Sequence, residues 1–193
     1  MAATGPSLTS QVARQIESAA RNSFIIAVND AYRVIPSAHV LYACDAKWWD
    51  VHEGCPEFAG EKWSSHGDTN DKLETAEKYG LKLVEGHHAD TFGTGRVHYG
   101  SNSGFQAINL AILFGARRII LAGFDMHNRS GRHFFGDHPK GLLNNNRYEN
   151  FVPAFEYAAK HLPEGIEIVN ATPGSAITCF PMVDLADALS ASP

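Results

Sequence analysis

Blocks of apolar residues alternate with polar segments along this chain, and the length of each block distinguishes strands from helices. The runs 24–28 (FIIAV) and 118–124 (RIILAGF) have the length of strands that are covered on both faces, as in a parallel sheet. Between them, Phe105, Ile108 and Ala111 recur at helical spacing and predict the buried face of a helix. The same reading predicts strands at 24–28, 40–43, 81–84, 118–124 and 166–169, a short turn or helix at 32–35, and helices that follow the turn at 5–7 and lie at 47–51, 73–79, 102–115, 151–162 and 183–189.

The alternation of strands and helices predicts the fold class. Strand–helix–strand units at this spacing form a mostly parallel sheet with helices on both faces, so we expect a single Rossmann-like α/β domain over 1–193. A chain of 193 residues is long enough to bury a core without disulfide bonds. The polar segments 53–71 and 86–100 show no clear period and are predicted to be long loops, which in compact domains usually serve a function.

Composition narrows the classes of protein that fit. A net charge of −5 argues against general nucleic-acid binding, which normally needs a basic face. The three cysteines are scattered without a CxxC pair, which is typical of a reduced, cytoplasmic setting. No apolar run reaches membrane-spanning length and the first residues lack the apolar core of a signal peptide, so we expect no membrane association.

Two predicted helix starts have the chemistry of anion sites. Gly5, Pro6 and Ser7 form a turn that leads into a helix, and Asn102 and the two residues after it open the central helix, with Ser103 as the expected cap. Free backbone N–H groups at such positions attract phosphate. The first turn poses a question, because a phosphate loop normally follows a strand. Either residues 1–4 form a minimal strand or that strand is missing.

Polar residues also follow several predicted strands at their carboxyl ends, where ligands of open α/β sheets bind. Asn29 and Asp45 each follow a strand and can bind a base, a ribose or a metal ion, although both residue types also favour ordinary turns. The strand 118–124 is followed by the densest cluster of such groups. These groups are of the types that form a divalent metal site or a general base with a residue that orients it, and they are Asp125, His127, His133, Asp137 and His138.

Several common catalytic motifs are absent from the sequence. It contains no GxxxxGK[ST] loop, no GxGxxG fingerprint, no GxSxG elbow and no HExxH pair. These absences argue against a P-loop kinase, an NAD-dependent oxidoreductase and an α/β-hydrolase.

A wider pattern resembles a family of uncharacterised phage and prophage proteins with a Rossmann-like fold. The pattern consists of 5–8 (GPSL) at a helix start, strands that end in Asn29 and Asp45, the segment 102–126 (NSGFQAINLAILFGARRIILAGFDM) and 133–139 (HFFGDHP). The same skeleton is similar, in three short patches, to the small bacterial sialyltransferases that use CMP-sialic acid and to the archaeal hydroxymethylpterin pyrophosphokinases.

The resemblance to the sialyltransferases implies roles for particular residues. In that family a GPSL-type turn contacts the nucleotide phosphate, and a serine–glycine helix start and a glycine–aspartate strand end line the donor site. Asn170 and Ser175 resemble a loop that closes over the nucleotide, and His133 and His138 are the candidates for the catalytic histidine. The donor-site roles fall here on Gly5, Pro6, Ser7, Asn29, Ser103, Gly104 and Asp125.

The leading hypothesis is a nucleotide- or nucleotide-sugar-dependent transferase that resembles a glycosyltransferase. His133 or His138 would deprotonate the acceptor, with Asp137 as the orienting group. Asp45 and Asn29 would orient the base or sugar. Asp125 would hold an acceptor hydroxyl or, with His127, a divalent metal ion. The first alternative is pyrophosphoryl transfer, which needs Mg²⁺ on carboxylates. The second is a non-catalytic phage protein that sequesters a nucleotide. A missing first strand would favour this alternative. The oligomeric state stays open.

Overall fold

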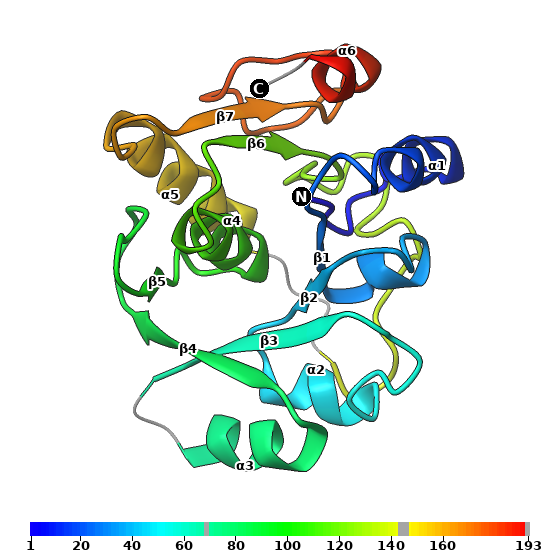
Figure 1. The fold of residues 1–193 in the computed structure, drawn as a ribbon, viewed down its shortest axis with the longest axis vertical. Helices are drawn as coiled ribbons and strands as arrows, with labels where there is room; N and C mark the ends of the chain where they lie inside the picture. The colour runs from blue at the N-terminus through cyan, green and yellow to red at the C-terminus, as the bar shows by residue number, and fades with distance from the viewer. Residues whose placement is uncertain (68–69, 143–146, 192–193) are drawn as a thin grey trace.

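Parallel strands form the centre of the molecule, and helices cover them on both sides (Figure 1). The computed structural model describes residues 1–67, 70–142 and 147–191. Its strands are β1 (Ile26–Val28), β2 (Val40–Tyr42), β3 (Glu61–His66), β4 (Lys82–His87), β5 (Val97–His98), β6 (Arg118–Leu121) and β7 (Glu167–Asn170). Its helices are α1 (Ser10–Ser18), the 3₁₀ helix η1 (Asn29–Arg33), α2 (Ala46–Val51), α3 (Asn70–Tyr79), α4 (Ser103–Leu113), α5 (Tyr148–Lys160) and α6 (Leu185–Ser190).

The first residues of the chain form the minimal strand that the sequence left open. Ala2 bridges in parallel to Ala27 on one side and to Ala122 on the other. The Ala2 N–H donates to Ile26 O at 3.0 Å, and the Ala3 N–H donates to Ala122 O at 2.9 Å. Residues 1–4 therefore connect the five strands β1–β5 to the pair β6–β7, and every strand pairing is parallel.

This short strand marks the point where the chain changes direction across the sheet. From it the chain moves outward through β1, β2, β3, β4 and β5, and then returns on the other side to β6 and β7. Ligands of open α/β sheets bind at such a switch point, outside the carboxyl ends of the strands. The Rossmann-like fold class predicted from the sequence is confirmed.

Alternate residues of the central strands face two separate cores. Ile26 and Val28 lie in the core that contains α4 and α5, whereas Ala27 lies in the core that contains α1, α2 and α6 (Figure 1). Ala2 and Ala3 divide in the same way between the two cores. The period of two in a strand explains this division, and it requires apolar residues at consecutive positions. In the described residues, no helix combines the length and the apolar character needed to cross a membrane.

The prediction of loops at 53–71 and 86–100 was wrong in two places. β3 lies inside the first segment and β5 inside the second. β3 is hard to predict because its sequence, EKWSSH, is polar, yet it pairs with β2 on one side and β4 on the other. Its position in the middle of the ladder stabilises it, whereas its own β propensity does not.

Buried polar side chains on α4 fix this helix against the sheet. Gln106 Oε1 accepts hydrogen bonds from Tyr42 Oη at 2.7 Å and Ser65 Oγ at 2.9 Å. Asn109 exchanges hydrogen bonds with the backbone of Gly93. Because buried polar groups need partners, these bonds specify one position for α4 and therefore for its first turn.

The ends of the central elements differ slightly from the prediction. Asn102, and not Ser103, caps α4, with its Oδ1 accepting from the Phe105 N–H at 2.8 Å. Gly115 follows the helix with a φ of 88°, as expected for a glycine after a helix C-terminus. β6 ends at Leu121 and not at residue 124, because Gly123 has a φ of 75° and turns the chain away from the ladder.

Candidate functional site

The candidate site is the carboxyl edge of the sheet beside the switch point. We use the term carboxyl edge for the residues that follow residues 1–4, β1, β2 and β6, together with the first turn of α4 and the loop 127–142. The fold brings most of the predicted polar residues to this edge. Their contacts show which of them are free to meet a ligand.

Asp125 binds the turn at residues 5–7 from inside the protein. Its Oδ1 accepts from the Ser7 N–H at 3.1 Å and its Oδ2 accepts from Ser7 Oγ at 2.6 Å. Asp125 is buried, and Gly5 packs so closely that an added Cβ would lie 1.9 Å from Asp125 Oδ2. The carboxylate therefore occupies the place at this turn where an anion would bind.

The backbone of this turn is fully engaged within the protein. The N–H groups of Gly5, Leu8 and Thr9 donate to Gly123 O, Gly5 O and Ser7 O, while Ser7 donates to Asp125 and Pro6 has no N–H. In this conformation a phosphate must displace Asp125 before it can bind here. The predicted phosphate-contact role of Gly5, Pro6 and Ser7 thus depends on a rearrangement that the sequence does not suggest.

His133 belongs to the loop 127–142, and the first strand, residues 1–4, orients its side chain. Its Nδ1 is 3.0 Å from Thr4 Oγ1, and the Phe134 N–H donates to Thr4 O at 2.9 Å. Phe135 is parallel to the imidazole, with ring centroids 5.0 Å apart. Nε2 is buried, and within the described part of the chain it has no hydrogen-bond partner.

The two candidate catalytic histidines are neighbours. The rings of His133 and His138 have centroids 4.5 Å apart. Burial and the proximity of His138 lower the pKa of His133 to about 4, and burial also lowers the pKa of His138. Both imidazoles are therefore neutral at pH 7. Asp137, the expected orienting group, is exposed and forms an ion pair with Arg132 at 3.0 Å.

Asp30 and His52 are candidate site residues that the sequence analysis missed. Asp30 follows β1, is completely buried, and accepts a hydrogen bond from Trp48 Nε1 at 3.0 Å. His52 follows α2, and its Nε2 is 3.6 Å from Asp30 Oδ1. A signal for Asp30 was present, since it stands next to the predicted Asn29 at a strand end. Nothing in the sequence marks His52.

Other predicted residues divide between the edge and its surroundings. Asn29 has a φ of 49° and turns the chain out of β1. Asp45 is exposed at the start of α2. Ser103 Oγ donates to Cys44 Sγ at 3.0 Å, and burial raises the pKa of this thiol to about 12. The first turn of α4, with Gly104, therefore faces the end of β2.

Asn170 and Ser175 stabilise the loop that follows β7. The Asn170 amide donates to Ile177 O at 2.9 Å and accepts from the Thr172 N–H. Ser175 Oγ donates to Phe124 O at 2.6 Å and accepts from the Ile177 N–H. These bonds hold the loop against the residues just before Asp125. Both side chains therefore stabilise the backbone of the carboxyl edge, and their polar atoms are used within the protein.

The described residues do not present a ready set of ligands for a metal ion. Among them, no three histidine, cysteine, aspartate or glutamate side chains are grouped closely enough to hold one. Both oxygens of Asp125 accept from Ser7, and His127 Nε2 bonds to Gly174 O at 3.1 Å. The predicted metal pair is thus engaged in separate contacts.

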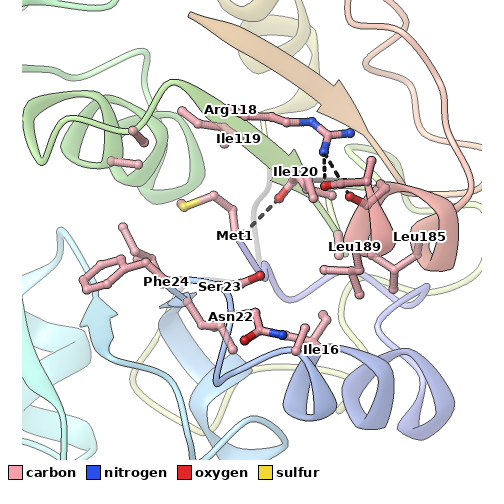
Figure 2. A pocket seen from close by; sticks show the side chains of 18 of the residues that line it. Met1, Ile16, Asn22, Ser23, Phe24, Arg118, Ile119, Ile120, Leu185 and Leu189 are labelled. Atoms are coloured by element: carbon pink, nitrogen blue, oxygen red, sulfur yellow. Dashed lines mark hydrogen bonds between the residues drawn. The ribbon is translucent and has the colours of Figure 1, made fainter. Parts of the chain in front are cut away.

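The molecule also has a cavity of about 700 Å³ at the amino end of the sheet, the end opposite the carboxyl edge. Figure 2 shows Met1, Phe24, Ile119 and Leu189 around it, where β1 and β6 begin. Its guanidinium group, from Arg118, already donates to the Ala188 and Ala191 carbonyls. We place the candidate site at the carboxyl edge, because the buried carboxylates Asp30 and Asp125 lie there, together with described histidine nitrogens that are buried without a hydrogen-bond partner.

Comparisons of this chain with models of protein families, with curated proteins and with solved structures gave no match.

Proposed function

We propose that this protein is a nucleotide- or nucleotide-sugar-dependent transferase of the phage type, with its ligand bound at the carboxyl edge. The observation that carries the proposal is the state of His133. This imidazole is held by Thr4 at the switch point, and its Nε2 has no hydrogen-bond partner among the described residues. A neutral imidazole with one nitrogen held by a hydrogen bond and the other left without a protein partner is the arrangement of a general base.

The geometry suggests how the base would work. When Nδ1 carries the proton and donates to Thr4 Oγ1, Nε2 is left with a lone pair that can accept the proton of an acceptor hydroxyl. The pKa of about 4 is low for a base at neutral pH. The negative charge of a bound nucleotide would raise this pKa toward the useful range.

Phosphate groups would bind on the α4 side of the edge. The first turn of this 11-residue helix presents the backbone N–H groups of Ser103 and Gly104, while Asn102 satisfies the N–H of Phe105. Helix starts of this kind attract anions. Because Phe135 covers the His133 ring, a substrate reaches Nε2 only when the loop 127–142 shifts.

The first test is a thermal-shift screen with CMP- and UDP-linked sugars and with ATP, each with and without Mg²⁺. A ligand at about 100 times its Kd stabilises the folded state by roughly 2.7 kcal/mol, which is readily measured as a higher Tm. A shift with a nucleotide-sugar supports glycosyl transfer. A shift with ATP only when Mg²⁺ is present favours pyrophosphoryl transfer instead, and no shift with any ligand contradicts the proposal.

The second test concerns the base. We expect His133→Ala and His138→Ala to fold, and at least one of them to lose transfer activity with the ligand found in the screen, by a factor of about 10² or more. His161→Ala is the matched control, because His161 is exposed after α5 and its ring contacts Tyr157 of that helix. Full activity in both variants would remove the base assignment.

A non-catalytic nucleotide-binding protein is the second candidate. The occupied turn at residues 5–7 favours it, since Asp125 binds the turn to which the resemblance to the sialyltransferases assigns the phosphate contact. The argument from the sequence for this candidate was that the first strand is missing. That argument no longer holds, because residues 1–4 form the strand. Tight nucleotide binding without turnover in the presence of acceptors would favour this candidate.

A further inference from the structure

The carboxylate of Asp30 is the most deeply buried charge at the carboxyl edge. Its side chain is completely inaccessible, and Oδ2 accepts from Trp48 Nε1 at 3.0 Å. Oδ1 lies 3.5 Å from Arg33 Nη1 and 3.6 Å from His52 Nε2, and in the described chain no donor forms a hydrogen bond with it. A buried carboxylate oxygen without a hydrogen bond is costly unless something else binds it.

Two further buried atoms in the same region also have no hydrogen-bond partner among the residues described. These are His52 Nε2 and His133 Nε2. Burial lowers the pKa of His133, and the charge of Asp30 opposes this effect, so the two groups lie within electrostatic reach. The three atoms come from η1, from the residue that follows α2 and from the loop 127–142, and a shared bound group would explain all of them.

The chemistry of the three atoms limits what that group can be. A phosphate would be repelled by the Asp30 carboxylate, and the metal-ligand geometry is absent from the described residues. A hydroxyl group fits, because it both donates and accepts hydrogen bonds. It can donate to Asp30 Oδ1 or His133 Nε2 and accept from His52 when Nε2 carries the proton.

We propose that Asp30, assisted by His52, binds hydroxyl groups of the ligand and selects ligands that carry them. This inference rests on the proposed function, and it adds the part of the ligand that Asp30 recognises. The hydroxyls belong either to the ribose or to the transferred sugar. When residues 1–4 are counted as the first strand, Asp30 follows the second strand, β1. An acidic residue at this position of a nucleotide-binding α/β sheet is well placed for this contact.

The competing explanation is structural: Asp30 only anchors Trp48 to η1, the 3₁₀ helix that follows β1. Two variants separate the explanations. Asp30→Asn keeps an acceptor for Trp48 Nε1 but removes the charge that a hydroxyl would meet. Trp48→Phe removes the Trp48–Asp30 bond and leaves the carboxylate in place.

The experiment is isothermal titration of the full chain with four probes: CMP, 2′-deoxy-CMP, UDP and UDP-glucose. For the wild type we expect CMP to bind more tightly than 2′-deoxy-CMP if the ribose is recognised, or UDP-glucose more tightly than UDP if the sugar is. In Asp30→Asn that preference should fall by about tenfold or more, as expected for the loss of a hydrogen bond to a charged group. His52→Gln should weaken the same preference. Trp48→Phe should lower the Tm but keep the wild-type preference between the probes.

Each contrary result has a separate meaning. A wild type that binds a probe without either preference, or an Asp30→Asn variant that keeps the wild-type preference, overturns the inference and leaves the proposed function standing. If Trp48→Phe loses the preference as Asp30→Asn does, then Asp30 has a structural role and the inference is overturned. A wild type that binds none of the four probes overturns the inference together with the proposed function.

Discussion

The two ends of the parallel sheet present opposite kinds of surface. At the carboxyl edge, Asp30 and Asp125 are buried and His133 is covered by an aromatic ring. At the amino end, apolar side chains such as Phe24 and Leu185 surround a cavity of about 700 Å³ (Figure 2). The amino-end cavity and the buried polar side chains of the carboxyl edge therefore lie at opposite ends of the sheet.

The comparison teaches that space alone is a poor guide to a site in this protein. Burying polar groups costs free energy, so a fold that keeps several of them at one edge indicates a use for them. At the amino-end cavity each charged group has its partners: the Met1 amine donates to Ile120 O at 2.9 Å, and Arg118 bonds to Glu167 and to the Ala188 and Ala191 carbonyls. Substitutions at the two ends should accordingly have unequal effects.

The largest effect is expected at Gly5. In Gly5→Ala, the new Cβ would lie 1.9 Å from Asp125 Oδ2 and 2.6 Å from Gly123 O. The backbone oxygen cannot yield, so the free energy of unfolding should fall by about 3 kcal/mol. Urea denaturation measures this change.

Gly95→Ala is the control for Gly5→Ala. An added Cβ at Gly95 meets no atom within 4 Å, so its stability should stay within about 1 kcal/mol of the wild type. Equal stability of the two variants would show that Asp125 does not hold the turn at residues 5–7 as the structure has it.

A smaller effect is expected from His133 and depends on pH. Because burial lowers its pKa from 6.5 to about 4, the unfolded chain binds a proton in this interval and the folded chain does not. The free energy of unfolding should therefore rise with pH between about 4 and 6.5 and lose this contribution as the pH falls. In His133→Gln the rise should be shallower, as measured by urea denaturation at several pH values.

The control for the pH experiment is His161→Gln, which changes an exposed histidine. Its profile should follow the wild type. If the free energy of unfolding of His133→Gln has the wild-type slope against pH as well, then His133 titrates normally. The description of its imidazole as covered and neutral would then be wrong.

The smallest effect is expected at the amino end. Phe24 is 60% exposed and touches His39 and Phe114. Phe24→Ala should change the free energy of unfolding by less than about 1 kcal/mol and leave the affinity for any nucleotide unchanged. A tenfold loss of nucleotide affinity in this variant, measured by titration calorimetry, would move the binding site to the amino end.

Much of the architecture was readable in the sequence. The runs 24–28 and 118–124 are mostly apolar at consecutive positions, which is typical of a strand covered on both faces, and each contains a central strand, β1 or β6. Gly115 and the polar residues after each strand marked where elements end. The sequence thus determined the fold class and the edge at which polar groups gather.

The tertiary structure decided what local signals do not contain. Residues 1–4 and β3 are strands because neighbours on both sides complete their ladders, and neither has a strong apolar pattern. Asp125 occupies the turn at residues 5–7 although 118 positions separate it from Ser7. Asp30 and His52 meet for the same reason. Contacts between distant segments depend on packing, whereas periodicity reports only on neighbours along the chain.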